Sequence, residues 1–148
     1  MKKNKIIILI VIILIAVLIA IGVYFGIKTV KINKYTSADE YEVKDVKIAS
    51  IKSIVGEKKI KDYSYDKNTT EILTLTFEDA DKEQTVKTYI DAIKDSGNYI
   101  EMEMQDSNKR QIACPDKELT TVQTEITENG FILTIEVGPG SIKVTEQE

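Results

Sequence analysis

The chain has 148 residues, of which 43% are hydrophobic and 30% are charged, and this length favours a single small domain. It contains one Cys and no His, which excludes an intrachain disulfide, a multi-cysteine metal site and the commonest general base near neutral pH. Charge is divided unevenly: residues 1–34 hold six Lys and no acidic side chain, whereas residues 35–148 hold 14 basic and 24 acidic ones, a net charge of −10.

The first expected element is an apolar stretch from Ile6 to Ile27, which contains no charged residue. As a helix it would be about 33 Å long, enough to cross a hydrocarbon core of about 30 Å. Lipid offers the backbone no hydrogen-bond partners, so a helix is expected in spite of the many β-branched Ile residues. A soluble domain of this size could not surround a helix that is apolar on every side. We therefore predict a transmembrane helix.

A cleaved signal peptide is the alternative for this segment. Three Lys among the first five residues would form its basic region, and the small residues Ala20 and Gly22 mark a site for cleavage after Gly22. The apolar run is longer than the roughly 7 to 15 residues usual in signal peptides, which favours an uncleaved anchor. A lipoprotein is excluded because the only cysteine, Cys114, lies far from the apolar stretch.

Lys residues flank the apolar stretch on both sides, and the group after it comprises Lys28, Lys31 and Lys34. The group before it is more closely spaced and includes the amino terminus, so we expect a cytoplasmic N-terminus and an extracellular C-terminal domain. Gly22 and Gly26 form a small-xxx-small pair, which makes a homodimer through these two glycines a minor alternative. The predicted partner of the stretch itself is the lipid bilayer.

Four segments follow from this interpretation: a cytoplasmic tail, a transmembrane helix, a juxtamembrane stalk and an extracytoplasmic α+β domain. Their expected bounds are residues 1–5, 6–27, 28–46 and 47–148. The stalk is expected because its C-terminal part is polar and lacks a hydrophobic period. Residues 43–56 mix helical and strand spacing, and Gly56 would end either element, so the structure of this segment stays open.

The next two segments predict a β-hairpin. Residues 58–65 form its first strand, with Tyr63 and Tyr65 on one face, and a polar turn follows at residues 66–68. Residues 70–77 form the second strand, because apolar side chains alternate there with threonines. The hairpin should therefore have one buried face and one face in water.

A helix is predicted over residues 82–96. Asp81 and Gln84 form a capping-box pattern at its start, and Gly97 marks its end. Four apolar side chains recur at helical spacing and should lie on the sheet: Val86, Tyr89, Ile90 and Ile93.

Four strand signals follow the helix, at residues 100–104, 110–114, 122–126 and 131–137. Asn129-Gly130 is typical of a type I′ hairpin turn between the last two. Ile142 and Val144 suggest a final edge strand or tail. The order β-β-α-β-β-β-β predicts an α+β fold, a small antiparallel sheet covered by one helix.

Acidic residues near the start of the predicted helix match part of a calcium-loop pattern. Asp79, Asp81 and Glu83 place oxygens at alternate positions, but Gln84 and Ile90 stand where such a loop requires Gly and a bidentate Glu. Acidic side chains at a helix N-terminus are favoured by the helix dipole alone. We therefore expect no metal ligands here.

Other candidate chemistry is equally sparse. Glu101 and Glu103 are expected side by side on one solvated strand face, because a glycosidase pair would need a cleft. Cys114 has no His to activate it and is expected to be a small core residue. The acidic body disfavours nucleic acid as a partner. We predict no catalytic, cofactor-binding or metal-binding residues, no cofactor and no enzymatic activity.

A structural motif runs from Phe77-Glu78-Asp79-Ala80 through residues 89–94 to Gly97. It resembles a pattern in uncharacterised small secreted or membrane-anchored proteins of low-GC Gram-positive bacteria, in which a strand ending in Phe-Glu leads into a Tyr-x-x-x-Ile/Leu-Lys helix and a glycine. The resemblance covers about residues 70 to 100, and no Cys follows the apolar stretch as in lipid-anchored members. It implies a cell-surface location and assigns no functional residue.

Three functional classes remain. The first is a single-pass membrane protein that displays a small non-catalytic binding or assembly domain outside the cell, where it would contact a protein or envelope component. The second is an accessory subunit of a membrane complex that acts through its transmembrane helix. The third, an envelope hydrolase, would require an open groove lined by Glu101 or Glu103.

Overall fold

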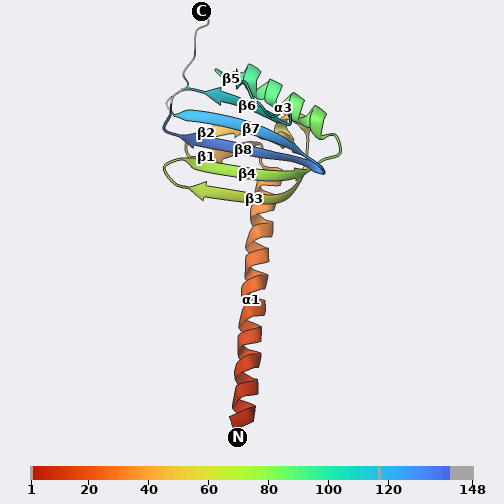
Figure 1. Cartoon of the computed structure of the whole chain (residues 1–148), viewed down its shortest axis with the longest axis vertical. Helices are drawn as coiled ribbons and strands as arrows, with labels where there is room; N and C mark the ends of the chain where they lie inside the picture. The colour runs from red at the N-terminus through yellow and green to blue at the C-terminus, as the bar shows by residue number, and fades with distance from the viewer. Residues whose placement is uncertain (1, 117, 141–148) are drawn as a thin grey trace, which may run out of the picture.

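The chain begins with one uninterrupted helix, α1 (Lys2–Ser37), in the computed structural model, which describes residues 2–116 and 118–140. Figure 1 shows most of this helix projecting from the rest of the molecule. The apolar residues from Ile6 to Ile27 are exposed, and Leu18 is 65% accessible. In length and composition the helix is sufficient to cross a membrane. Such a bare apolar surface requires lipid or protein around it.

The segment predicted as a stalk, residues 28–46, has a different structure. Helix α1 continues to Ser37, and a two-stranded hairpin begins only two residues later, with β1 (Glu40–Val43) and β2 (Val46–Ala49). Ile32 and Tyr35, three positions apart on one side of α1, pack against the core of the domain. The domain is therefore attached directly to the helix.

The ambiguous residues 43–56 contain both kinds of structure in succession. Strand β2 is followed by the one-turn helix α2 (Ile51–Val55). The Ser50 hydroxyl caps this helix by accepting a hydrogen bond of 3.1 Å from the Ser53 backbone N–H. Gly56 ends it with a φ of 93°, a conformation that favours glycine.

The main sheet has six antiparallel strands in the order β3-β4-β8-β7-β6-β5. Together with helix α3 they confirm the predicted order β-β-α-β-β-β-β and the α+β fold class. Strand β3 lies nearest to the projecting part of α1 in Figure 1. The bounds are β3 (Lys59–Lys67), β4 (Glu71–Glu78), α3 (Lys82–Ser96), β5 (Ile100–Met102), β6 (Lys109–Cys114), β7 (Leu119–Thr127) and β8 (Gly130–Gly138).

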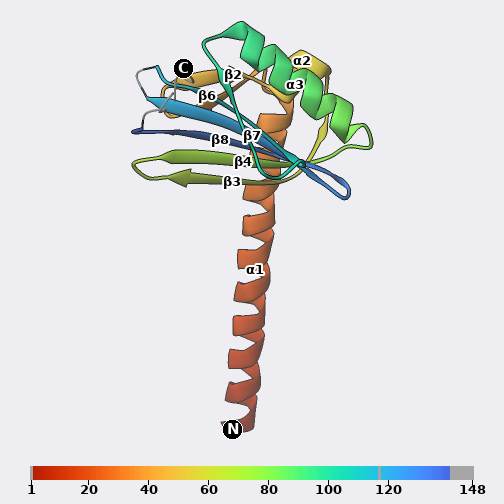
Figure 2. The same ribbon diagram turned by 45° about the horizontal axis from the view of Figure 1, so that its top comes forward.

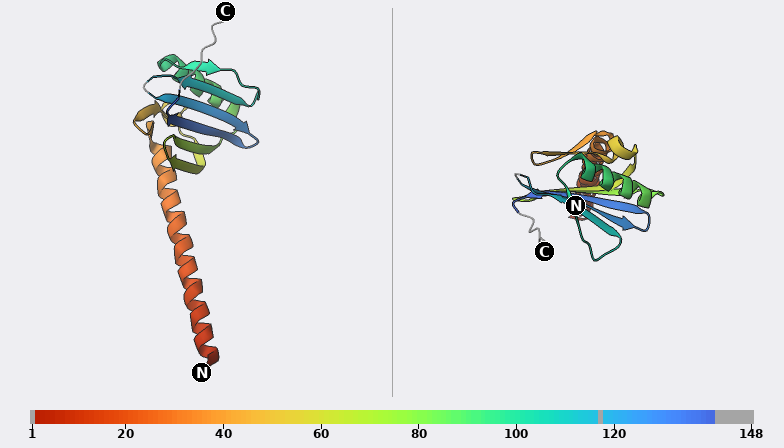
Figure 3. Two further views of the ribbon diagram at one scale, coloured as in Figure 1. Left: turned by 60° about the vertical axis from the view of Figure 1, so that its left-hand side comes forward. Right: turned by 90° about the horizontal axis from the view of Figure 1, so that it is seen from above.

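One face of this sheet carries the hydrophobic core. Helix α3 packs against β6, β7 and β8, while the β1–β2 hairpin and α2 complete the same layer (Figures 2 and 3). The predicted stripe on α3 is confirmed, because its four side chains are at most 2% exposed. On the sheet, alternate residues of β4, β7 and β8 face this layer, as their period of two requires.

One predicted turn signal, Asn129-Gly130, has a different role in the structure. The β7–β8 hairpin forms, but its loop residues are Glu128 and Asn129, and neither Asn129 nor Gly130 has a positive φ. Gly130 is instead the first residue of β8, where a Cβ atom would lie 1.9 Å from the Phe77 carbonyl oxygen. A close approach of two backbones, and not a type I′ turn, therefore requires this glycine.

The remaining differences concern the ends of elements. Asp81 makes no side-chain capping hydrogen bond at the start of α3. Strand β5 ends at Met102, so Met104 lies outside it. The possible last strand at Ile142 and Val144 falls outside the described residues.

Candidate functional site: a groove beside the apolar helix

Asp79, the first residue of the partial calcium-loop pattern, uses its oxygens within the fold. Its Oδ1 accepts hydrogen bonds from Lys58 Nζ at 3.0 Å and the Asp81 backbone N–H at 3.1 Å, and its Oδ2 accepts one from Thr85 Oγ1 at 2.5 Å. Burial would raise the pKa of Asp79, but the bonds from Thr85 and Lys58 outweigh it and hold this pKa below its ordinary value. Asp79 thus links the start of α3 to the sheet.

Contrary to the prediction, Glu101 and Glu103 do not lie side by side on one strand face. Glu101 lies in β5 and forms ion pairs with Lys94 at 2.9 Å and with Arg110 at 2.8 Å. Hydrogen bonds from these two cations lower the pKa of Glu101. Glu103 follows the end of β5 and is exposed.

Cys114, at the end of β6, is a buried free thiol, as expected for a core residue. Burial is the largest cause that raises the pKa of this thiol, and nearby Asp116 raises it further. Among the described residues, no group of three His, Cys, Asp or Glu side chains is placed to hold a metal ion.

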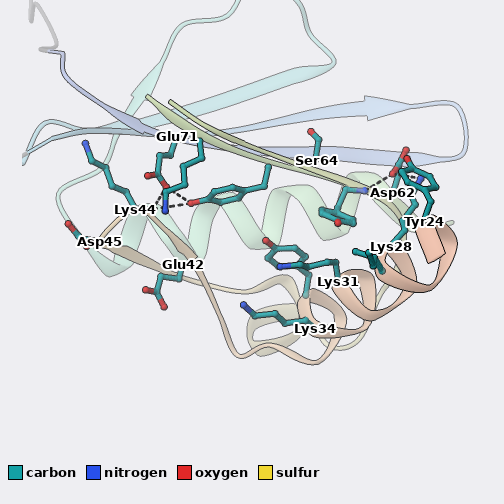
Figure 4. Close-up of a pocket in the computed structure, with 15 residues that line it drawn as sticks. Tyr24, Lys28, Lys31, Lys34, Glu42, Lys44, Asp45, Asp62, Ser64 and Glu71 are labelled. Atoms are coloured by element: carbon teal, nitrogen blue, oxygen red, sulfur yellow. Dashed lines mark hydrogen bonds and ion pairs between the residues drawn. The ribbon is translucent and has the colours of Figure 1, made fainter. Parts of the chain in front are cut away.

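A groove of about 1080 Å³ opens beside α1, immediately after its apolar stretch. Figure 4 shows its two walls, the C-terminal part of α1 and the inner surface of β3, with the β1–β2 turn at the far end. We call this feature the membrane-boundary groove. The residues that line it are Tyr24, Ile27, Lys28, Lys31, Lys34, Tyr35, Glu42, Lys44, Asp45, Asp62, Tyr63, Ser64, Tyr65, Lys67 and Glu71.

An ion pair and a pair of tilted aromatic rings hold the two walls of the groove together. Lys28 Nζ lies 2.9 Å from Asp62 Oδ1, and this hydrogen bond is the main cause of the lowered pKa of Asp62. About two turns further along α1, the Tyr35 ring lies 5.7 Å from the Tyr63 ring. These contacts fix the edge strand β3 to the helix.

The far end of the groove is a polar cluster around Glu71, which is only 8% exposed. The Glu71 carboxylate accepts a short hydrogen bond from the Tyr65 hydroxyl and one of 3.2 Å from the Lys44 backbone N–H. Lys44 adopts a φ of 54° in the β1–β2 turn, and its Nζ pairs with Glu118. Burial and the bond to Glu71 raise the pKa of Tyr65.

The sequence contains one signal of this cluster, which was not predicted. Glu71 has the same strand phase as Leu73 and Leu75, so alternation alone places its carboxylate on the buried face. A buried carboxylate requires donors, and the donors come from residues 44 and 65. No local pattern shows that these distant residues meet.

Between the two ends, Lys31 and Lys34 extend from α1 into the groove (Figure 4). Both side chains are exposed, and within the described part of the chain neither forms an ion pair. Two ammonium groups without carboxylate partners give this middle section a capacity to bind an anion.

A second surface is the face of the main sheet opposite to α3. Five polar, uncharged side chains form a continuous row across it, one from each of five neighbouring strands, over about 19 Å at the usual strand spacing. No described element packs against this face, and Figure 3 shows the helices and the hairpin on the other side. We call it the open sheet face. The row is Ser64, Thr74, Thr134, Gln123 and Gln111.

Comparison of the chain with protein-family models, with curated proteins and with solved structures gives no match. The resemblance drawn from residues 77–97 stays a prediction.

Proposed function

We propose that this protein is a single-pass membrane-anchored protein that displays a small, non-catalytic binding domain outside the cell. The observation that carries this proposal is the continuity of α1. The same helix supplies an exposed apolar stretch long enough to cross a bilayer and then contributes Ile32 and Tyr35 to the packing of the domain. An anchor that is part of the fold suits a domain held at a fixed distance and tilt above a membrane.

The open sheet face is the binding surface that we propose for a protein or envelope-component partner. Its hydroxyl and amide groups both donate and accept hydrogen bonds, which suits a polar partner. The opposite face of the sheet is occupied by the core, and the membrane-boundary groove adjoins the open sheet face only at its β3 edge, through Ser64. The rest of the open sheet face is a broad surface that the described elements leave uncovered.

The topology is testable with one engineered cysteine. Ser107, in the exposed turn before β6, is replaced by Cys in a Cys114→Ala background, and intact cells are treated with a membrane-impermeant maleimide. We expect labelling before lysis, with the Cys114→Ala chain as the unlabelled control. Labelling only after lysis would place the domain inside, and recovery of the chain in the medium beginning near Val23 would show a cleaved signal peptide.

The binding surface is testable by photo-crosslinking in living cells. A photoreactive phenylalanine analogue at Gln123, in the centre of the open sheet face, should capture a partner that the same analogue at Thr88, on the exposed side of α3, does not. Equal capture at both positions, or adducts at Thr88 alone, would contradict the proposed surface.

The second functional class, an accessory subunit acting through its transmembrane helix, is favoured by one observation. Around Gly22 and Gly26 there is open space on the surface of α1, so another helix has access to both. Exchange of residues 6–27 for an unrelated apolar span separates the two classes. A loss of function with the domain intact would favour the accessory subunit. A hydrolase receives no support, because the membrane-boundary groove is lined by neither Glu101 nor Glu103.

A further inference from the structure

The position of the membrane-boundary groove relative to the apolar stretch determines which ligands can enter the groove. The uncharged run ends at Ile27, and Lys28, Lys31 and Lys34 follow within about 10 Å along the helix axis at 1.5 Å per residue. The headgroup layer of a bilayer adds about 5 to 7 Å to each side of its hydrocarbon core. With the stretch in a membrane, Lys28 lies within the headgroup layer, Lys31 lies near its outer boundary, and the Lys34 backbone lies about 3 to 5 Å beyond that boundary.

Charge within the groove is divided between its two ends. On the membrane side, Asp62 is the acidic lining residue and already pairs with Lys28, which leaves Lys31 and Lys34, in the middle section, to confer positive charge. The far end holds three acidic residues, Glu42, Asp45 and Glu71, beside Lys67 and a Lys44 that already pairs with Glu118. An anion is therefore favoured beside Lys31 and Lys34 over the far end, where carboxylates outnumber lysines.

The lining of the membrane end is also amphipathic. Tyr24 and Ile27 belong to the last turn of the apolar stretch, and the Tyr63 ring lines the groove with Tyr35, about two turns beyond Ile27 on α1. A phospholipid matches this gradient, since its acyl chains would remain beside Tyr24 and Ile27 while its phosphate reaches the ammonium groups.

We propose that the membrane-boundary groove binds the phosphate of an anionic phospholipid from the adjacent leaflet, with Lys31 and Lys34 as its charged ligands. This inference rests on the proposed membrane anchoring. An extended acidic peptide fits less well, because it would have to pass the carboxylates at the far end, and a soluble phosphate ester has no apolar part to lie beside Ile27. The site would hold the acidic domain against an anionic surface that otherwise repels it.

The test uses the full chain in vesicles of phosphatidylcholine containing a minority of phosphatidylglycerol. Electron spin resonance of spin-labelled lipids measures how strongly the protein selects phosphatidylglycerol over phosphatidylcholine. We expect a clear selectivity for phosphatidylglycerol that falls about fivefold for each lysine replaced in Lys31→Gln and Lys34→Gln, the factor equivalent to about 1 kcal/mol per lysine near an anionic surface. The matched control, Lys47→Gln with Lys87→Gln, removes two exposed lysines outside the groove and should keep the selectivity.

A charge-relocated variant distinguishes a site from general attraction. Exchange of neighbours, V30K with K31V and N33K with K34N, keeps the net charge and depth but moves both ammonium groups to positions that do not line the groove. Selectivity should be lost in this variant, and wild-type selectivity would overturn the proposal. Displacement of the labelled lipid by inorganic phosphate or by a polyglutamate peptide would overturn the lipid assignment. Release of the wild-type chain from vesicles by an alkaline wash would instead refute the anchoring.

Discussion

At the scale of single residues, Asp79 shows how one side chain connects three elements. Its carboxylate receives Lys58 from the segment before β3, Thr85 from α3 and the backbone that begins the helix. The side chain is only 6% exposed, so water cannot replace a lost partner. The acidic pattern before α3 therefore has a structural explanation in the hydrogen bonds of one residue.

The first prediction concerns Asp79→Asn. Because hydrogen bonds to a buried charged group contribute about 1.5 to 3 kcal/mol, we expect this variant to lower the free energy of unfolding by about 2 kcal/mol at pH 7. Pulse proteolysis of the full chain in urea, in detergent micelles, measures the change. Asp81→Asn is the control, since Asp81 makes no side-chain capping bond, and an equal loss in both variants would contradict the assignment.

The same residue gives a second prediction, on pH. The folded-state pKa of Asp79 is lowered from 3.8, so its stabilising contribution is present above the unfolded value and is lost as pH falls through the folded pKa. The difference in unfolding free energy between wild type and Asp79→Asn should therefore be constant near pH 6 and shrink below about pH 4. A difference that grew toward acid pH would have the wrong sign for this mechanism.

A third prediction concerns Gly130. A methyl group at this position would meet the Phe77 carbonyl oxygen and carbon at 1.9 and 2.9 Å, so two paired strands would have to separate. We expect Gly130→Ala to lower the free energy of unfolding by at least about 2 kcal/mol. Gly97→Ala is a suitable control, because its Cβ would meet only the Tyr99 ring, at 3.4 Å. Thermal unfolding followed by far-UV circular dichroism compares the two.

At the scale of elements, helix α3 supplies side chains that complete the hydrophobic core on one face of the sheet. Ile90 is fully buried at the centre of the helix stripe, between Val86 and Ile93. The fourth prediction is that Ile90→Asp unfolds the domain, because burying an unpaired carboxylate exceeds the roughly 5 to 15 kcal/mol that stabilises a domain of this size. Limited proteolysis of the full chain should show loss of the resistant fragment. Thr88→Asp, which places the same charge on the exposed side, should keep the fragment.

Local sequence patterns predicted the elements that bury one whole face against the hydrophobic core. The alternation in residues 70–77 and the stripe from Val86 to Ile93 are confirmed because one whole face of each is buried. Prediction failed where one or two distant contacts decide the structure. Ile32 and Tyr35 lie among polar residues and lysines, and nothing near them in sequence shows that β3 covers them.

The groove illustrates the same distinction. The lysines after the apolar run are evident as charges in the sequence. Their division into Lys28, which is paired, and Lys31 and Lys34, which form no ion pair among the described residues, depends on Asp62, more than 25 positions away. The Glu71 cluster likewise needs the backbone of Lys44 in a turn that no local signal predicted. Hydrophobic periodicity cannot predict a site that is assembled from an edge strand, a helix end and a turn.

At the scale of the whole molecule, helix α1 and the domain form one folded body, because Ile32 and Tyr35 pack against the core. The fifth prediction tests this through Tyr35, whose ring packs near both Tyr41 and Tyr63. Tyr35→Ala should lower the free energy of unfolding of the domain by about 2 kcal/mol, although the substitution lies in the anchor helix. Val30→Ala, on the same helix but at a side chain 68% exposed, should leave it unchanged. Pulse proteolysis in micelles measures both, and equal effects would indicate a domain independent of the helix.

The unbroken helix between the apolar stretch and the domain also transmits rotation. Because α1 is continuous through residues 28–37, rotation of its apolar part about the helix axis rotates the open sheet face through the same angle. One residue added after Ile27 would rotate the open sheet face by about 100° about the helix axis and move the domain along that axis by only about 1.5 Å. A second helix packed against the apolar stretch would therefore determine whether the open sheet face points toward or away from a neighbouring protein.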